Sequence, residues 1–127
     1  SLVVWCLLNT VETLPEAHYR GGVAPAEDVR RALERAGKFL SGCVAADGTL
    51  LWEGNETSTA KHNMWTYALT ANVLRRIGGE ANVAAAERLL GYALSRRSAS
   101  GLLPMRDEGE EITECAYMQA DMLLFLR

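Results

Sequence analysis

The stretch Lys61–Ile77, KHNMWTYALTANVLRRI, decides how the rest of the chain must be arranged. On a helix, its apolar residues point in nearly every direction, and few polar residues interrupt them before the Arg75–Arg76 end. A helix that is apolar all round is buried all round. We therefore expect this helix at the centre of the protein, with other helices surrounding it.

Four other segments have the length and periodicity of helices. Two of them, Leu2–Leu14 and Ile112–Leu126, are apolar on most faces, as the central helix is. The other two, from Pro25 to Val44 and from Asn82 to Leu94, each have one apolar stripe and one charged face. We therefore predict an all-α protein of repeated antiparallel helical hairpins, in which buried inner helices alternate with outer helices on the surface.

Local signals mark the helix ends. The pair Gly78–Gly79 predicts a left-handed cap after the central helix, and Asn82 is predicted to cap the helix that follows. The inward stripe predicted for the first outer helix contains Val29, Ala32, Leu33, Ala36, Phe39, Leu40, Cys43 and Val44. The stripe predicted for the second contains Val83, Ala86, Leu89, Leu90, Ala93 and Leu94.

The unit of outer helix, Gly-Leu loop and inner helix occurs twice. In the first copy LERAGKFLSGCVAADGTLLW leads to WTYALTANVLRR, and in the second AERLLGYALSRRSASGLLPM leads to CAYMQADMLLFLR. Tyr67 and Tyr117 occupy matching positions, about fifty residues apart. A period of that size is typical of stacked supersecondary units, none of which can bury its own apolar face alone.

Composition and charge exclude several classes of protein. The chain has 127 residues, of which 49% are hydrophobic and 23% charged, as is ordinary for one globular domain. A net charge of -3 with scattered basic residues argues against nucleic acid as a partner. The apolar run SLVVWCLL is far shorter than the ~20 residues that span a bilayer. We therefore expect no membrane segment and a cytoplasmic location.

The sequence also leads to expectations about the thiols, metal sites and cofactors. Cys6, Cys43 and Cys115 lie in apolar runs without CxxC spacing, which predicts reduced thiols packed as small hydrophobic groups. His62 has no second histidine at a ligand spacing, so we expect no metal site. The sequence has no glycine-rich phosphate loop and no GxSxG nucleophile motif, and we expect no cofactor.

The repeated hairpins, with DGTLLW or SGLLP in the connection, resemble the α/α-toroid proteins. That group includes six-hairpin glycosidases, related polysaccharide lyases and sugar epimerases, terpenoid cyclases and prenyltransferases. The resemblance covers roughly Val29 to Arg127. SGLLPMRD is similar to the GLLP-type loops of the glycosidase branch, and DGTLLW is similar to the DG-aromatic turn of the cyclase branch. The DxDD motif of the cyclases and the zinc-binding set of the prenyltransferases have no match, which favours the glycosidase branch.

The resemblance implies a larger assembly, because a closed toroid of this type has more helices than the sequence predicts here. We therefore expect residues 1–127 to be a single helical-hairpin domain and a portion of a larger toroid. Leu2–Leu14 and Ile112–Leu126 are then expected to pack on hairpins of a longer chain or on a homo-oligomer partner, since bare apolar helices would expose an unusually large patch.

In the family, the loops that precede the inner helices carry the active site. Glycoside hydrolysis needs one protonated and one ionised carboxyl group, about 5–9 Å apart, and flat aromatic side chains stack on sugar rings. The resemblance therefore implies Asp107 and Glu108 as catalytic residues. The substrate-binding residues that it implies are Trp52, Glu53, Glu56, His62, Trp65, Arg106, Tyr117 and Asp121.

Structural roles compete with these predictions. Acidic residues ahead of a helix are stabilised by its dipole, and Trp52, Trp65 and Tyr117 could instead fill the core. A carboxylate inside an apolar helix is costly unless it is paired. Asp121 is therefore expected either to face a polar cavity or to pair with an arginine at the Arg75–Arg76 end.

These observations lead to three functional hypotheses. The first is part of a carbohydrate-active α/α-toroid enzyme, similar to a glycoside hydrolase, that acts on an oligo- or polysaccharide substrate. The alternative is a non-catalytic helical-hairpin module whose exposed inner helices bind another chain. The third is an isoprenoid cyclase-like protein.

Overall fold

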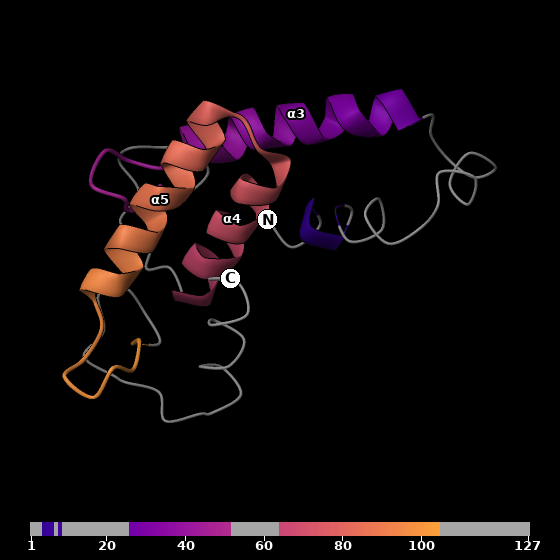
Figure 1. The fold of residues 1–127 in the computed structure, drawn as a ribbon. Helices are drawn as coiled ribbons and strands as arrows, with labels where there is room; N and C mark the ends of the chain where they lie inside the picture. Colours follow the sequence, from indigo (N-terminus) through magenta and orange to yellow (C-terminus); the bar gives the residue numbers. More distant parts are fainter. Residues whose placement is uncertain (1–3, 7, 9–25, 52–63, 105–127) are drawn as a thin grey trace.

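The computed structural model describes residues 4–6, 8, 26–51 and 64–104, and these residues are predominantly helical (Figure 1). Three helices follow one another in the chain: α3 (Ala26–Gly42), α4 (Met64–Ile77) and α5 (Glu80–Ser95). Residues 4–6 and 8 are helical as well, within the segment predicted as Leu2–Leu14. The four helices pack against one another, which confirms the all-α class. The predicted helix Ile112–Leu126 lies outside the described residues.

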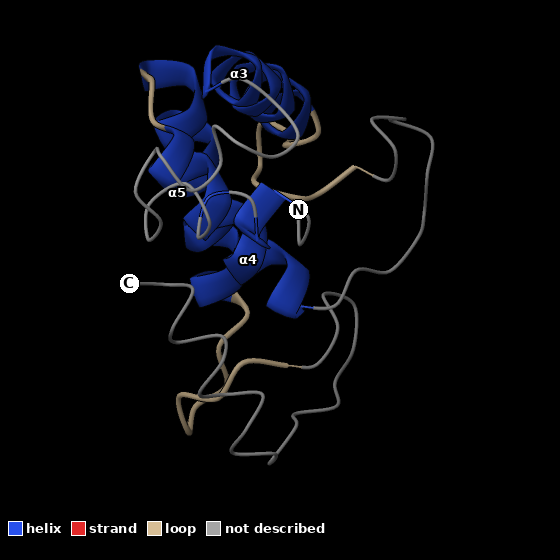
Figure 2. Cartoon of the chain, turned by 90° about the vertical axis from the view of Figure 1, so that its right-hand side faces the viewer, coloured by secondary structure: helices blue, strands red, loops and turns tan. Residues whose placement is uncertain are grey.

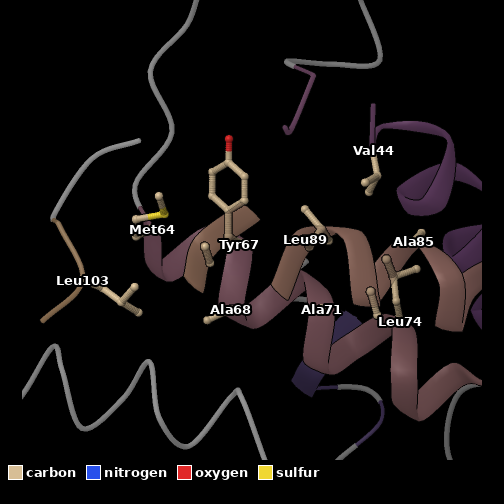
Figure 3. Packing of buried hydrophobic residues seen from close by; sticks show 11 residues of the cluster. Val44, Met64, Tyr67, Ala68, Ala71, Leu74, Ala85, Leu89 and Leu103 are labelled. Carbon is tan, nitrogen blue, oxygen red and sulfur yellow. The ribbon is translucent and has the colours of Figure 1, made fainter. Parts of the chain in front are cut away.

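The helix α4 is the centre of the packing, as predicted for Lys61–Ile77. Of that predicted range, the structure describes Met64–Ile77. Its buried residues are Met64, Tyr67, Ala68, Leu69, Thr70, Ala71, Val73 and Leu74. Leu69 and Val73 pack against Leu8 of the N-terminal helical segment. Most of the other buried side chains share a second cluster with α5 (Figure 3). Because α4 has helices on opposite sides, it must be apolar nearly all round.

The helix α5 runs beside α4 and buries a face made mainly of alanines. This face consists of Ala85, Ala86, Leu89 and Ala93, each at most 1% exposed. The predicted stripe was wrong at its two ends, because Val83 is 36% exposed and Leu94 is 48% exposed. Alanines allow the two helices to approach closely, while the larger side chains of α4 fill the space between them.

Gly78 and Gly79 form the turn between α4 and α5, with φ of 77° and 85°, so the predicted left-handed conformation is confirmed. The prediction that Asn82 caps α5 was wrong. Gly79 occupies the N-cap position, and no side chain hydrogen-bonds there. The Asn82 side-chain amide instead donates to the carbonyl oxygen of Gly78 at 2.8 Å. It thereby satisfies one of the carbonyl groups that a helix end leaves open.

The helix α3 lies across the end of the α4–α5 pair where the chain turns (Figures 1 and 2). Gly37 makes this crossing possible: a Cβ atom there would lie 2.7 Å from Asn82 Nδ2 and 3.0 Å from Ile77 Cγ2. The predicted one-sided character is confirmed in outline, since charged residues of α3 are exposed and its apolar residues are largely half-buried. Phe39 departs from the predicted stripe, because it is 60% exposed.

The two described cysteines differ in burial. Cys43 is buried at the end of α3, as predicted, whereas Cys6 is exposed and its predicted packing was wrong. Cys115 lies outside the described residues. In the ranges that the structure describes, no helix combines the length and apolar character needed to cross a membrane.

Replacing Leu69 with aspartate should unfold the chain. Leu69 is 1% exposed and belongs to the hydrophobic cluster that contains Leu8 and Val73. A carboxylate at this position would lose its hydration without gaining a polar partner from that cluster. We expect circular dichroism to show loss of helix. Arg31→Ala is the control: its ion pair with Glu27, at 3.6 Å, is exposed, so the change should cost less than about 0.5 kcal/mol. An unchanged melting curve for Leu69→Asp would contradict the central place of α4.

Candidate functional site

Of the predicted site residues, Trp65 is the one that falls within the described ranges. The others lie outside them: Trp52, Glu53, Glu56, His62, Arg106, Asp107, Glu108, Tyr117 and Asp121. The structure therefore bears on the predicted site through Trp65 and through the first part of each loop.

Trp65 is the second residue of α4 and is half-buried. Its side chain packs against both hydrophobic clusters, on either side of the helix. The buried part of the Trp65 ring therefore has the core role that was one of the two predictions for this residue. The remaining surface is accessible near the start of α4, where the first loop joins the helix.

The first loop begins with a tight turn closed by two backbone hydrogen bonds. The N–H of Gly48 donates to the oxygen of Ala45 at 3.1 Å, and the N–H of Ala45 donates to the oxygen of Thr49 at 2.9 Å. Gly48 has φ of 89°, a conformation that residues with a Cβ atom rarely adopt. Beside this turn, Val44 and Leu50 form an isolated antiparallel bridge.

The second loop begins with a turn of the same construction. The N–H of Gly101 donates to the oxygen of Ser98, and the N–H of Ser98 donates to the oxygen of Leu102, both at 2.9 Å. Gly101 has φ of 88°. The three residues of these hydrogen bonds lie 53 positions after their counterparts in the first turn. Gly101, for example, corresponds to Gly48. The glycine turn of the repeat predicted from the sequence is therefore present in both units.

The ends of the preceding outer helices follow the same correspondence. Cys43 and Arg96 donate their N–H groups to Leu40 and Ala93, at 3.1 and 3.2 Å. The next residues, Val44 and Arg97, donate to Ser41 and Leu94, both at 3.2 Å. The two units therefore match from the last turn of the outer helix to the residue after the glycine.

Asp47 shapes the first turn. Its Oδ1 accepts hydrogen bonds from the Thr49 hydroxyl at 2.7 Å and from the Thr49 N–H at 3.0 Å. The hydroxyl first, and the N–H second, hold the pKa of Asp47 below its ordinary value of 3.8. A carboxylate bonded in this way is a turn-forming residue, and because it is ionised at neutral pH it is unsuited to act as a general acid.

The first turn is held against both α4 and α5. The buried Tyr67 hydroxyl accepts a hydrogen bond from the Leu50 N–H at 3.2 Å. The Tyr67 ring, which stands off α4 in Figure 3, stacks on Tyr92 with 5.2 Å between centroids and 21° between planes. A Cβ atom on Gly48 would lie 2.9 Å from Tyr92 Cβ and closer still to the carbonyl oxygen of Arg88. Sequence reasoning identified the DG turn but missed these contacts, which no local pattern encodes.

A surface hollow of about 440 Å³ lies where α3 crosses the α4–α5 turn. It is lined by Glu34, Lys38, Ser41 and residues 77–82. Its charged residues Glu34, Lys38 and Glu80 are all exposed, so the hollow offers hydrogen bonds but no desolvated acid or base of the kind that active sites use.

Within residues 4–6, 8, 26–51 and 64–104, no group of three or more His, Cys, Asp or Glu side chains could hold a metal ion. Comparisons with protein-family models, with curated proteins and with solved structures found no match.

Replacing Gly48 with alanine should cost about 2–4 kcal/mol of stability in dilute solution. The positive φ accounts for about 1–2 kcal/mol, and the clash with the α5 backbone adds a packing penalty of similar size. Gly101→Ala separates the two effects, because it has the same φ with no described atom within 4 Å of the added Cβ, so we expect only the first cost. Gly91→Ala, within α5 and also unobstructed, should stabilise by about 0.5–1 kcal/mol.

Urea unfolding of these three variants measures the differences. Equal losses for Gly48→Ala and Gly101→Ala would mean that the close approach of the first turn to α5 contributes nothing.

The Asp47→Ala substitution should destabilise the fold by less than about 1 kcal/mol at neutral pH, because the lost hydrogen bonds are solvent-exposed. The folded-state pKa of Asp47 is depressed, so its contribution is present above the ordinary pKa near 3.8 and is lost as pH falls through the lower, folded value. Melts of both proteins from neutral pH to acid should therefore converge below about pH 4. A difference that persists undiminished in acid would contradict this role.

Proposed function

We propose that this chain is part of a carbohydrate-active enzyme built from helical hairpins as an α/α toroid, and that the enzyme hydrolyses an oligo- or polysaccharide. The observation that carries the proposal is the repeat of the outer-helix end and its glycine turn, which in the first unit precede the buried helix α4. The burial of α4 between its neighbours supports its role as an inner helix.

In this proposal, Asp107 and Glu108 are the general acid and its partner carboxylate. They follow the second turn by a few residues, as Trp52 and Glu53 follow the first. Two turns with the same backbone would deliver the residues after them to comparable positions. A carboxyl separation of about 5–5.5 Å would give retention of anomeric configuration, and about 6.5–9.5 Å would give inversion.

The substrate would lie along the aromatic and polar residues of both loops. The accessible part of the Trp65 ring supports a sugar-stacking role at the start of α4. Trp52 and Tyr117 would add further stacking surfaces. The polar residues that would hydrogen-bond sugar hydroxyl groups are Glu53, Glu56, His62, Arg106 and Asp121.

Asp107→Asn and Glu108→Gln should each lower turnover by about 10²–10⁴-fold in the complete protein, because a general acid or base is lost. Both changes keep the side-chain shape, and we expect the melting temperature to stay nearly unchanged. The assay is release of reducing sugar from a panel of oligosaccharides. Asp47→Asn is the matched control, since its carboxylate belongs to the first turn, and it should keep the wild-type rate. Wild-type rates for both Asp107→Asn and Glu108→Gln would move the chemistry elsewhere.

A non-catalytic module that binds another chain is the second candidate function. The exposed Phe39 and the half-buried apolar residues of α3 favour it. Titration with oligosaccharides separates the two candidates. Resonance shifts confined to Trp52 and Trp65 would support the enzyme, and the absence of shifts at saturating sugar would favour the module.

A further inference from the structure

The first turn is tied to α4 by a hydrogen bond that lies outside its own backbone pattern. Val44 and Leu50 face each other in the antiparallel bridge. The backbone hydrogen bonds of the bridge join the residues on either side of this pair, so the N–H of Leu50 points away from the opposite segment. It points to α4 instead, where the Tyr67 hydroxyl accepts it at 3.2 Å.

The Tyr67 hydroxyl has a role that packing alone does not require. The side chain is 0% exposed, and its ring stands off α4 with the hydroxyl at the far end (Figure 3). The stack on Tyr92, with 5.2 Å between centroids, fixes the direction of the ring. A phenylalanine ring would fill the same space and keep the stack. A buried hydroxyl costs free energy unless it is hydrogen-bonded, and the bond with the Leu50 N–H gives this hydroxyl a role that phenylalanine lacks.

This hydrogen bond lies next to the proposed substrate surface. Trp65 stands two residues before Tyr67 on α4, and part of its ring is accessible. Leu50 and Trp65 both pack against the hydrophobic cluster that contains Tyr67. In the sequence, Leu50 comes two residues before Trp52, with which the proposed substrate-binding residues of the first loop begin. The hydroxyl therefore fixes the start of that loop relative to the ring that is proposed to stack on a sugar.

We infer that Tyr67 is a positioning residue for the substrate. Its hydroxyl holds the start of the first loop in place relative to Trp65, and it acts through the Leu50 backbone because the side chain itself is buried. This inference rests on the proposed function, since it concerns the same site. The proposed general acid and its partner, Asp107 and Glu108, belong to the second loop. Loss of the hydroxyl should therefore weaken substrate binding and leave the chemical step unchanged.

The substitution Tyr67→Phe in the complete protein tests the inference, with release of reducing sugar as the assay. We expect KM for an oligosaccharide to rise about three- to tenfold, as the loss of one hydrogen bond predicts. The value of kcat should stay within about twofold of the wild type, because a uniform loss of binding changes KM alone.

Amide hydrogen exchange in the same variant reports on the turn directly. Exchange at the Leu50 N–H should become at least about threefold faster, because its partner is lost. Exchange at the Ala45 N–H should not change, because that group stays bonded to the Thr49 oxygen within the turn. Faster exchange at both positions would indicate general destabilisation, and would overturn the inference.

The substitution Asn82→Ala is the matched control. It also removes one partly buried hydrogen bond from a side chain to the backbone, the bond to the Gly78 oxygen at 2.8 Å, but at the opposite end of α4. It should lower the melting temperature to a similar extent, while KM and kcat stay at the wild-type values. Tyr92→Leu, which removes the ring that directs the hydroxyl, is a second variant that should raise KM in the same direction, and it is used if Tyr67→Phe fails to fold.

The outcomes separate this inference from the proposed function. A wild-type protein that releases no sugar from any substrate in the panel overturns both. Wild-type turnover with an unchanged KM in Tyr67→Phe overturns the inference alone, and so does an equal rise in KM from Asn82→Ala. A fall in kcat at constant KM also overturns the inference, because the hydroxyl would then act on the chemical step.

Discussion

The burial of α4 on opposite sides is the constraint on which the rest of the structure depends. One side packs on the N-terminal helical segment through Leu69 and Val73, and the other packs on α5 through Ala71 and Leu74. Full burial of each large apolar side chain contributes about 1.5–3 kcal/mol. No pair of helices could bury both sides, so the surrounding helices assemble around α4 as a group.

Tyr67 extends this constraint from the core to the loop. Its ring is fully buried, and its hydroxyl receives the N–H of Leu50. Stacking on Tyr92 then joins the same side chain to α5. Gly48 completes the arrangement, because the turn can reach the α5 backbone only without a Cβ atom. The start of the first loop is thus positioned by long-range contacts.

The repeated turn connects the architecture to the proposed function. The matching turn hydrogen bonds and glycine φ at the start of each loop support the proposed site formed from residues that follow the two turns. The same geometry also reveals where the two units differ, since one glycine is buried against a helix and the other is exposed.

The sequence by itself determined the described helices, the buried character of α4 and the repeated glycine turn, because these follow from local periodicity and from glycines that need positive φ. It placed Ala86, Leu89 and Ala93 on the buried face of α5 but extended that face wrongly to Val83 and Leu94, because Ala85 gives a weak hydrophobic signal beside them. It also could not assign Asn82 to the Gly78 carbonyl oxygen. Of the candidate site, the sequence identified Trp65 and the DG turn, but not the Tyr67–Tyr92 stack or the role of Asp47 in that turn. Only the tertiary structure decided these points, because each depends on how closely separate segments approach, and the alanines and glycines that allow close approach have little or no side chain by which a pattern could predict it.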